Sequence, residues 1–220
     1  MSKSSQRTAY GEELVELGKE NPNIVVLDAD LCKSTMSSFF QDAFPNRFFE
    51  MGIAEQNMLS TAAGLAAGGK IPFAGTFAVF AAGRAYDQMR QTIAIGKLNV
   101  NLCGSSCGLS DFGDGSTHQS VEDVALMSAI PGMTVFTPCD AAETRKAVRA
   151  AAKIEGPVYI RVSRNPLEDF TNDDSIFDVG KIRVLADGND VAIFAHGAHR
   201  ISVCHTLMDF LFLRCDVTVP

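Results

Sequence analysis

Short, almost wholly apolar runs recur along this 220-residue chain, and segments with helical spacing separate them. The clearest run, Ile-Val-Val-Leu at 24–27, follows a segment in which Tyr10, Leu14 and Leu17 recur at the spacing of a helix. A strand that is apolar on both faces must be covered on both faces, and helices between strands allow neighbouring strands to run parallel. The sequence therefore predicts an α/β fold, a mostly parallel sheet with helices on both faces.

The expected elements follow one another with short connections. Strands are expected over residues 24–27, 47–51, 71–77, 98–103, 133–137 and 158–162, with helices over 37–44, 54–67 and 84–95. Ser120 with Asp123, and Asp140 with Glu143, resemble capping boxes and predict two further helix starts. Ligands of parallel sheets bind beyond the carboxyl ends of the strands, and here these ends lead into residues 28–34, 51–55, 76–80 and 104–119.

The chain is expected to divide into a main domain and the start of a second one. Residues 1–165 hold the main domain, and residues 166–188 read as a linker because periodicity fades there. Residues 189–220 predict a strand over 190–195, a helix over 201–213 and a short strand over 216–219. Such a short segment cannot bury a core alone, so it is expected to be either the truncated start of a second α/β domain or a unit docked on the first.

Composition excludes several classes of protein. The net charge of −7 argues against a nucleic-acid or anionic-membrane surface, which requires clustered Lys and Arg. Six cysteines are too dilute for a disulfide scaffold. The polar N-terminus does not resemble a signal peptide, and no apolar run reaches the roughly 20 residues of a membrane span. A cytoplasmic location is expected, and the modest charge content favours an additional buried face at a subunit contact.

The most informative motif is Phe-Glu-Met-Gly-Ile-Ala-Glu-Gln-Asn at 49–57, in which Glu55 begins a helix directly after a strand. On its own this carboxylate could simply be a favourable charge at a helix N-terminus. Three further motifs occur in order, at 75–80 (Gly-Thr-Phe-Ala-Val-Phe), 84–88 (Arg-Ala-Tyr-Asp-Gln) and 113–119 (Gly-Asp-Gly-Ser-Thr-His-Gln). Together they resemble the transketolase family, and more narrowly the separate C-terminal subunit of split transketolases, over roughly residues 7–165.

This resemblance implies the pyrimidine-binding domain of a thiamine diphosphate enzyme. In the family, the glutamate that matches Glu55 hydrogen-bonds N1′ of the cofactor's aminopyrimidine. Phe77 and Phe80 match positions where aromatic rings lie against the pyrimidine, with Phe80 the preferred stacking ring, and Asp30 matches an aspartate near the thiazolium. Core packing for the two phenylalanines and a strand-end turn for Asp30 remain alternatives.

The resemblance also implies a sugar-phosphate site. Arg7, Ser34 and Arg164 fall at positions that resemble the family's phosphate contacts, and arginine donors suit a phosphate. Asp114 and His118 match residues that contact the substrate's hydroxyl and carbonyl region, and His118 is a candidate catalytic proton carrier. Each of the three phosphate candidates, taken singly, could be an ordinary solvated surface residue.

Two departures from the family leave the donor sugar open. Ser106, within Gly-Ser-Ser-Cys-Gly at 104–108, occupies the place of a substrate histidine in many transketolases. Asp-Phe-Gly at 111–113 replaces a more usual Gly-Gly-Glu-like run.

No metal site is expected in this chain. Gly113-Asp114-Gly115 resembles the start of the diphosphate motif of thiamine enzymes, but no Asn follows it through Ala141. His196, His199 and His205 are spaced too loosely for a convincing metal cluster. Diphosphate and Mg²⁺ ligands are therefore expected on a partner chain.

The resemblance thus implies a transketolase C-terminal subunit that transfers a two-carbon ketol unit between sugar phosphates, as in pentose phosphate metabolism. Its partner is expected to be the diphosphate-binding N-terminal subunit, and a homodimer contact would then give a heterotetramer. The alternatives are a 1-deoxyxylulose-5-phosphate synthase-like subunit, a 2-oxoacid dehydrogenase β-like subunit, or a non-catalytic assembly or regulatory subunit of the same fold.

Overall fold

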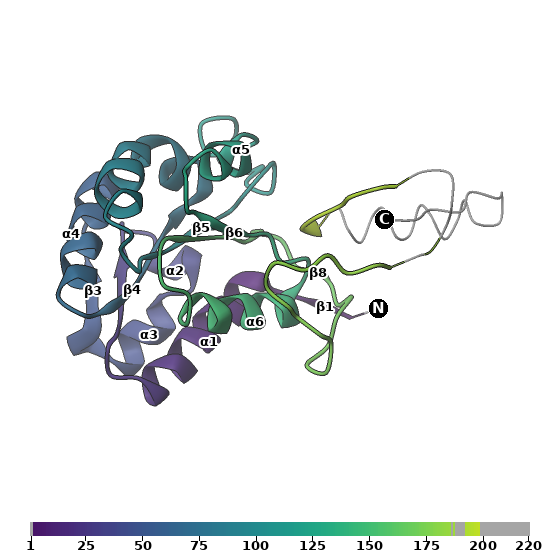
Figure 1. Cartoon of the computed structure of the whole chain (residues 1–220), viewed down its shortest axis with the longest axis horizontal. Coiled ribbons are helices and arrows are strands. Elements are labelled where there is room, and N and C mark those ends of the chain that lie inside the picture. The colour runs from purple at the N-terminus through teal and green to yellow at the C-terminus, as the bar shows by residue number, and fades with distance from the viewer. Residues whose placement is uncertain (1, 186, 188–191, 199–220) are drawn as a thin grey trace.

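A six-stranded, wholly parallel sheet forms the centre of the computed structural model, which describes residues 2–185, 187 and 192–198 (Figure 1). Each neighbouring pair of strands is hydrogen-bonded in parallel register. Across the sheet the strands are β3 (Phe48–Glu50), β2 (Ile24–Asp28), β4 (Ile71–Phe77), β5 (Asn101–Ser105), β7 (Val158–Arg161) and β6 (Thr134–Phe136). The α/β fold expected from the apolar runs is confirmed.

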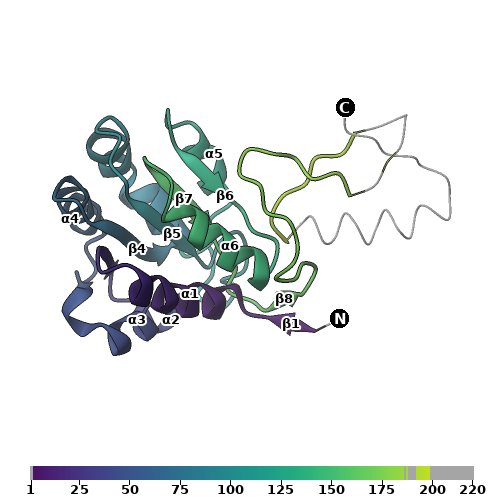
Figure 2. The same cartoon turned by 60° about the horizontal axis from the view of Figure 1, so that its bottom comes forward.

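Helices cover both faces of this sheet (Figure 2). One face carries α1 (Gln6–Glu20), α2 (Cys32–Thr35), α3 (Ser38–Ala43) and α6 (Ala141–Ala151). The other carries α4 (Glu55–Ala67), the π-helical segments η2 (Phe80–Arg84) and η3 (Gln88–Ala94), and α5 (Asp123–Ser128). A single 3₁₀ turn, η1 (Pro45–Arg47), precedes β3.

The two faces of the sheet bury separate apolar cores because successive strand residues point to opposite sides. In β2, Val26 packs into the core that contains Tyr10 and Leu14 of α1. Its neighbour Leu27 packs into the core that contains Met58 of α4. Double-sided burial is therefore the physical reason why the strand sequences lack polar alternation.

Several predicted elements differ from the observed ones. β5 begins at Asn101 rather than 98, and the helix expected over 84–95 is replaced by η2 and η3, whose hydrogen bonds are those of a π-helix. The short helix α2 was not anticipated from the sequence.

Of the two predicted capping boxes, one is confirmed and one is wrong. The Asp140 side chain accepts a hydrogen bond from the Glu143 N–H at 2.8 Å, as the box at α6 requires. In contrast, α5 begins at Asp123 and Ser120 does not cap it. The Asp123 carboxylate is buried and binds the side chains of β7 instead of closing a helix start.

The N-terminal strand pairs with a strand that follows the main sheet in the sequence. Strand β1 (Lys3–Ser4) pairs antiparallel with β8 (Leu167–Glu168), which lies inside the segment predicted as a linker. Residues 192–195 have no strand, contrary to the strand expected over 190–195, and the elements expected over 201–213 and 216–219 lie outside the described residues. Among the described helices, none has the length and apolar character that a membrane crossing requires.

Candidate active site

The predicted site residues lie around the carboxyl edge of the sheet, where the loops after β2, β3, β4 and β5 begin. The first turn of α1 reaches the same edge, because Arg7 contacts Ser34 in the loop after β2. The structure divides most of the predicted residues into two contacting groups, one aromatic and one charged.

Glu55 lies at the centre of the first group. It is the first residue of α4, directly after the β3 loop, and its side chain is only 1% exposed. Both of its carboxylate oxygens accept hydrogen bonds from Nη1 of Arg84, at 3.0 and 2.9 Å. A buried carboxylate needs such a partner, because an unpaired charge is costly away from water.

Phe77, Phe80 and His118 complete this group around the Glu55–Arg84 ion pair. Phe77 ends β4 and Phe80 begins η2, and their rings are nearly parallel, with centroids 6.2 Å apart. His118 meets both rings edge-on, at centroid distances of 6.1 Å from Phe77 and 5.3 Å from Phe80. The Arg84 guanidinium carbon lies 4.3 Å from the Phe80 ring centroid. Four predicted residues therefore contact one another through one that was not predicted.

Arg84 was present in a motif that carried the resemblance, but no role was assigned to it. The signal was available in principle. A glutamate at a buried helix start requires a cation, and Arg84 follows Phe80 by four residues, which places the two on one face of a helical segment. Only the folded chain shows that this cation also covers the Phe80 ring.

The second group consists of two hydrogen-bonded sets, Arg7 with Ser34 and Arg164 with Asp111 and Asp114, which act on each other through their charges. Arg7, in the first turn of α1, donates from Nη1 to the backbone oxygen of Ser34 at 2.6 Å. Arg164, which follows β7, donates from Nη1 to Asp111 Oδ1 and, at 3.2 Å, to Asp114 Oδ2. Asp111 is fully buried, whereas Asp114 is half exposed.

The charges of this second group act on one another. Burial lowers the pKa of Arg7, the like charge of Arg164 lowers it further, and the carboxylate of Asp111 opposes both effects. Arg7 Nε is buried without a hydrogen-bond partner. The two arginines therefore lie close enough to repel, and Asp111 reduces that repulsion.

Asp28 organises the loop that carries Ser34. It ends β2, and its carboxylate accepts hydrogen bonds from the Leu31 N–H at 2.6 Å and from the Thr35 and Ser37 hydroxyls at 2.8 Å each. Burial raises the pKa of Asp28 to about 6 despite these three donors. Asp28 therefore holds the backbone of residues 28–37 in a defined path.

Asp30 lies outside both groups. Its backbone is in the left-handed region, with φ of 63°, and its N–H donates to Glu50 Oε1 at 2.7 Å. The same oxygen accepts from the Gly52 N–H at 3.1 Å, in the loop that leads to Glu55. A turn role thus accounts for the local geometry of Asp30, and its proposed place near a thiazolium remains a prediction.

The long loop after β5 is anchored to β7. The Cys107 N–H donates to the Val162 oxygen at 3.2 Å, and Asp123 accepts from the Tyr159 hydroxyl at 2.9 Å and from Arg161 Nε at 2.8 Å. Burial raises the pKa of Cys107 to about 11, so the thiol stays protonated near neutral pH and the side chain serves in packing. The anchored loop presents Asp114 and His118 at the edge of the sheet.

Ser106, which was expected at the place of a substrate histidine, is fully buried. It has a φ of 54°, and its hydroxyl has no hydrogen-bond partner. A serine in this position cannot reach a ligand at the surface without moving the backbone.

Within the described residues, no group of three or more His, Cys, Asp or Glu side chains could hold a metal ion. Asp114 of the Gly-Asp-Gly run pairs with Arg164 instead. His196 lies within the described part of the chain, whereas His199 and His205 lie outside it.

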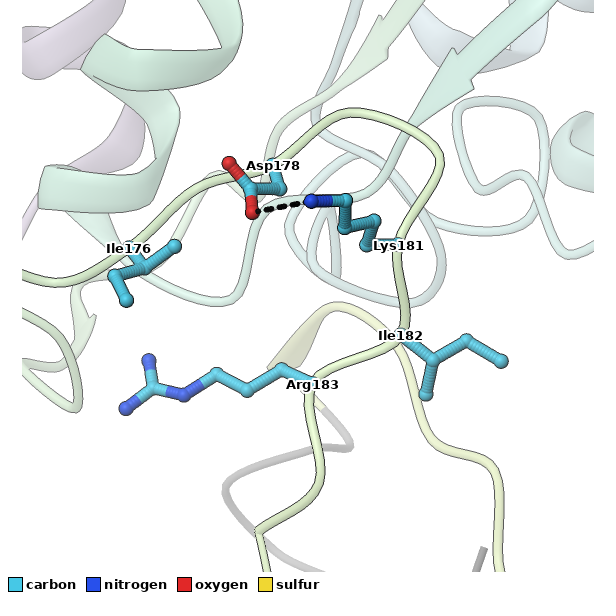
Figure 3. A pocket seen from close by; sticks show the side chains of 5 residues that line it. All are labelled: Ile176, Asp178, Lys181, Ile182 and Arg183. Carbon is cyan, nitrogen blue, oxygen red and sulfur yellow. Dashed lines mark hydrogen bonds and ion pairs between the residues drawn. The ribbon is translucent and has the colours of Figure 1, made fainter. Parts of the chain in front are cut away.

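A separate hollow of about 230 Å³ lies in the segment after β8 (Figure 3). It contains the ion pair between Lys181 and Asp178, at 3.2 Å. Its lining residues are Ile176, Asp178, Lys181, Ile182 and Arg183. None of the predicted site residues lines it.

Comparison with known proteins gives one family. Residues 2–169 match the model of the transketolase pyrimidine-binding domain. A protein of Methanocaldococcus jannaschii that is described as the C-terminal section of a transketolase is 46% identical over 193 residues, covering 87% of this chain and 61% of the relative. The "6-deoxy-6-sulfo-D-fructose transketolase subunit SqwH" of Clostridium sp. is 42% identical over 191 residues, covering 87% and 59%.

A solved structure gives the same answer. The "Split gene transketolase, inactive beta4 tetramer" superposes with a TM-score of 0.84 at 49% identity, covering 97% of this chain and 68% of that chain. This chain thus spans about three fifths of the length of the two curated relatives that it matches.

Proposed function

The chain belongs to the transketolase family through its pyrimidine-binding domain, and from that premise we propose that it supplies one side of a thiamine diphosphate site for ketol transfer. The observation that carries this proposal is the position of Glu55, a buried carboxylate at a helix start that Arg84 links to the parallel rings of Phe80 and Phe77. The proposed catalytic residues are Glu55 and His118.

The residues of the first group fit the aminopyrimidine half of this cofactor. An aminopyrimidine needs a flat apolar surface and a carboxylate at the edge of its ring, and Phe77, Phe80 and Glu55 supply both. Asp30 is the proposed residue on the thiazolium side. When bound, thiamine diphosphate supplies the carbanion chemistry that ketol transfer needs.

The chain's own residues would bind the ring and move protons. Glu55 can share a proton with a ring nitrogen because its carboxylate is buried away from bulk water. The Thr117 hydroxyl lies 2.9 Å from Nδ1 of His118, which fixes the imidazole plane and leaves Nε2 for proton exchange with a substrate.

The second group is the proposed substrate site. Arg7, Ser34 and Arg164 would bind the charged end of a sugar, and Asp114 would accept hydrogen bonds from its hydroxyl groups. The resemblance implies a phosphate at this end. The name of the Clostridium relative makes a sulfonate the second candidate.

We propose that the diphosphate and Mg²⁺ are bound by a separate N-terminal subunit. This is supported by the description of the Methanocaldococcus jannaschii relative as the C-terminal section of a transketolase, since neither half of the site would suffice alone. A homodimer contact of this chain would then give a heterotetramer. The division into residues 1–165, 166–188 and 189–220 is likewise a proposal.

The decisive experiment is the substitution Glu55→Gln in the chain mixed with its diphosphate-binding partner. Glutamine keeps the shape but cannot take up a proton, so ketol transfer between sugar phosphates should fall by about a hundredfold or more. Glu16→Gln is the matched control, because Glu16 is half exposed on α1 and pairs only with Lys19 in the described structure. Circular dichroism checks that both variants fold.

Full activity of the Glu55→Gln complex would show that the assigned role is wrong. A wild-type chain that binds the partner but transfers no ketol unit from any sugar tested would instead identify a non-catalytic subunit.

A further inference from the structure

We propose that Asp111 determines the charge of the substrate that this site accepts, favouring a sugar whose end group carries a single negative charge, a sulfonate, over a phosphate dianion. This inference rests on the proposed function, because it concerns the terminal group of the sugar. It is carried by the buried ion pair of Asp111 with Arg164, whose charges also act on Arg7, an arrangement that the family resemblance did not imply.

Asp111 is built into the site rather than placed beside it. The residue is fully buried on the loop after β5, and one carboxylate oxygen forms the ion pair with Arg164. Its other oxygen, Oδ2, is buried without a hydrogen-bond partner. The carboxylate therefore cannot rotate into solvent when a ligand arrives.

The positive charge of the group is largely offset before any ligand binds. Nη1 of Arg164 already donates to two carboxylates, Asp111 and Asp114. Arg7 keeps a free charge, since its described hydrogen bond goes to the neutral backbone oxygen of Ser34. The two guanidinium charges and the two carboxylate charges of this group cancel, which leaves little net charge to attract a dianion.

No other cation on the adjoining loop restores this charge. Residues 104–119 contain neither Lys nor Arg, and Ser106 is buried. A phosphate dianion would meet the Asp111 carboxylate with twice the repulsion that a monoanion meets. A sulfonate has three acceptor oxygens of similar geometry and only one charge, so it keeps the arginine contacts and halves the repulsion.

The test compares two donors in the complex of this chain with its diphosphate-binding partner. One is a ketohexose with a sulfonate at C6, and the other is the same sugar with a phosphate at C6. The wild-type complex should use the sulfonate sugar with the higher kcat/KM. Asp111→Asn should raise the phosphate-to-sulfonate ratio of kcat/KM about tenfold or more, which corresponds to about 1.4 kcal/mol.

Asp42→Asn is the matched control. Asp42 is exposed on α3, so this substitution removes the same charge at a position outside the site. Its ratio should equal that of the wild type. A wild-type preference for phosphate, or an unchanged ratio in Asp111→Asn, would overturn the proposal.

A second measurement needs no variant. The second ionisation of a phosphate monoester lies near pH 6, whereas a sulfonate keeps one charge throughout. Lowering the pH through this value converts the phosphate to a monoanion, so it should raise the wild-type phosphate-to-sulfonate ratio of kcat/KM. Any effect of Asp28 titration that is common to both sugars cancels in this ratio. A falling ratio would show that the site prefers the dianion.

Failure of the proposed function has a different signature. If neither sugar is turned over, the ketol-transfer proposal fails, and the site is then tested by binding alone. Methanesulfonate should perturb the NMR signals of the Arg7 and Arg164 side chains at lower concentration than methyl phosphate at neutral pH. The reverse order would overturn the role of Asp111.

Discussion

At the scale of single residues, Arg84 makes the two contacts that the proposed cofactor ring needs. It binds both oxygens of Glu55 and lies over the Phe80 ring. A planar guanidinium and an aminopyrimidine are alike in being flat groups that donate hydrogen bonds at their edges. If the cofactor binds Glu55 and Phe80 as proposed, Arg84 must move away.

We expect Arg84→Met to bind thiamine diphosphate more tightly than the wild type, by about tenfold, which is about 1.4 kcal/mol. The ion pair stabilises the free state, and its loss leaves Glu55 without a partner until the cofactor arrives. Isothermal titration calorimetry of the chain with its partner measures the change. The variant should also unfold at a lower temperature when no cofactor is present.

Arg90→Met is the control for this substitution, since Arg90 is exposed on the adjacent segment η3. Its cofactor affinity should match the wild type. Weaker binding by Arg84→Met would mean that Arg84 stays beside the cofactor and assists it.

At the scale of elements, a glycine in β5 leaves room for a tyrosine side chain of the neighbouring strand β7. A Cβ atom added to Gly104 would lie 2.1 Å from the Tyr159 hydroxyl oxygen, the same hydroxyl that donates to Asp123. Asp123 begins α5 and also pairs with Arg161. The contacts of this carboxylate therefore join β7, α5 and the end of the long loop after β5, next to the close approach of β5 at Gly104.

Gly104→Ala should therefore lower the free energy of unfolding by about 1–3 kcal/mol, because Tyr159 must leave its hydrogen bond to make room. Urea denaturation followed by circular dichroism measures the loss. Gly64→Ala in α4 is the control, since nothing lies within 4 Å of its added Cβ. That change should stabilise the chain by about 0.5–1 kcal/mol, as alanine suits a helix better than glycine.

If the two variants were equally stable, the close approach at Gly104 would have been relieved by strand movement without loss of the Tyr159 contact. The Gly104 variant should also lose ketol transfer, because the loop that presents Asp114 and His118 is anchored through this contact.

At the scale of the whole molecule, the sheet with its two helical layers is joined to an exposed segment after β8 (Figure 1). Residues 178–185 are exposed and contain no helix or strand. Exposed, irregular backbone is where proteases cut native proteins first. This segment lies in the predicted linker.

Among the bonds of the described residues, trypsin should first cut after Lys181 or Arg183, leaving the six-stranded sheet intact. Timed digestion with mass spectrometry would identify the product. The double change Lys181→Gln and Arg183→Gln should slow this cut, whereas Lys153→Gln, exposed after α6, should not. A first cut within residues 2–165 would contradict the proposed division of the chain.

Much of the fold could be predicted because periodicity is a local property. Strand β4 matches its prediction, and α4 begins within one residue of it. The exchange of an expected helix for η2 and η3 and the false box at Ser120 have a different origin. At Ser120 long-range contacts outweighed local preference, since Asp123 pairs with Tyr159 and Arg161, and residue spacing alone does not distinguish a π-helix from an α-helix.

The candidate site divides in the same way. The resemblance supplied Glu55, Phe77, Phe80 and His118, and the structure brings the three rings into contact and links Glu55 to them through Arg84. Asp111 was noted only as a departure, because nothing in Asp-Phe-Gly at 111–113 indicates a partner more than fifty residues away. Burial and charge pairing are properties of the assembled chain.

The sequence by itself determined the parallel sheet, its coverage on both faces and the family to which its motifs point, since each depends on residue types at short spacing. Only the tertiary structure decided that Arg84 forms an ion pair with Glu55 and that the carboxylate of Asp111 offsets the charge of Arg164. The physical reason is that an ion pair depends on distance and burial, and both are set when segments far apart in the chain meet at the carboxyl edge of the sheet.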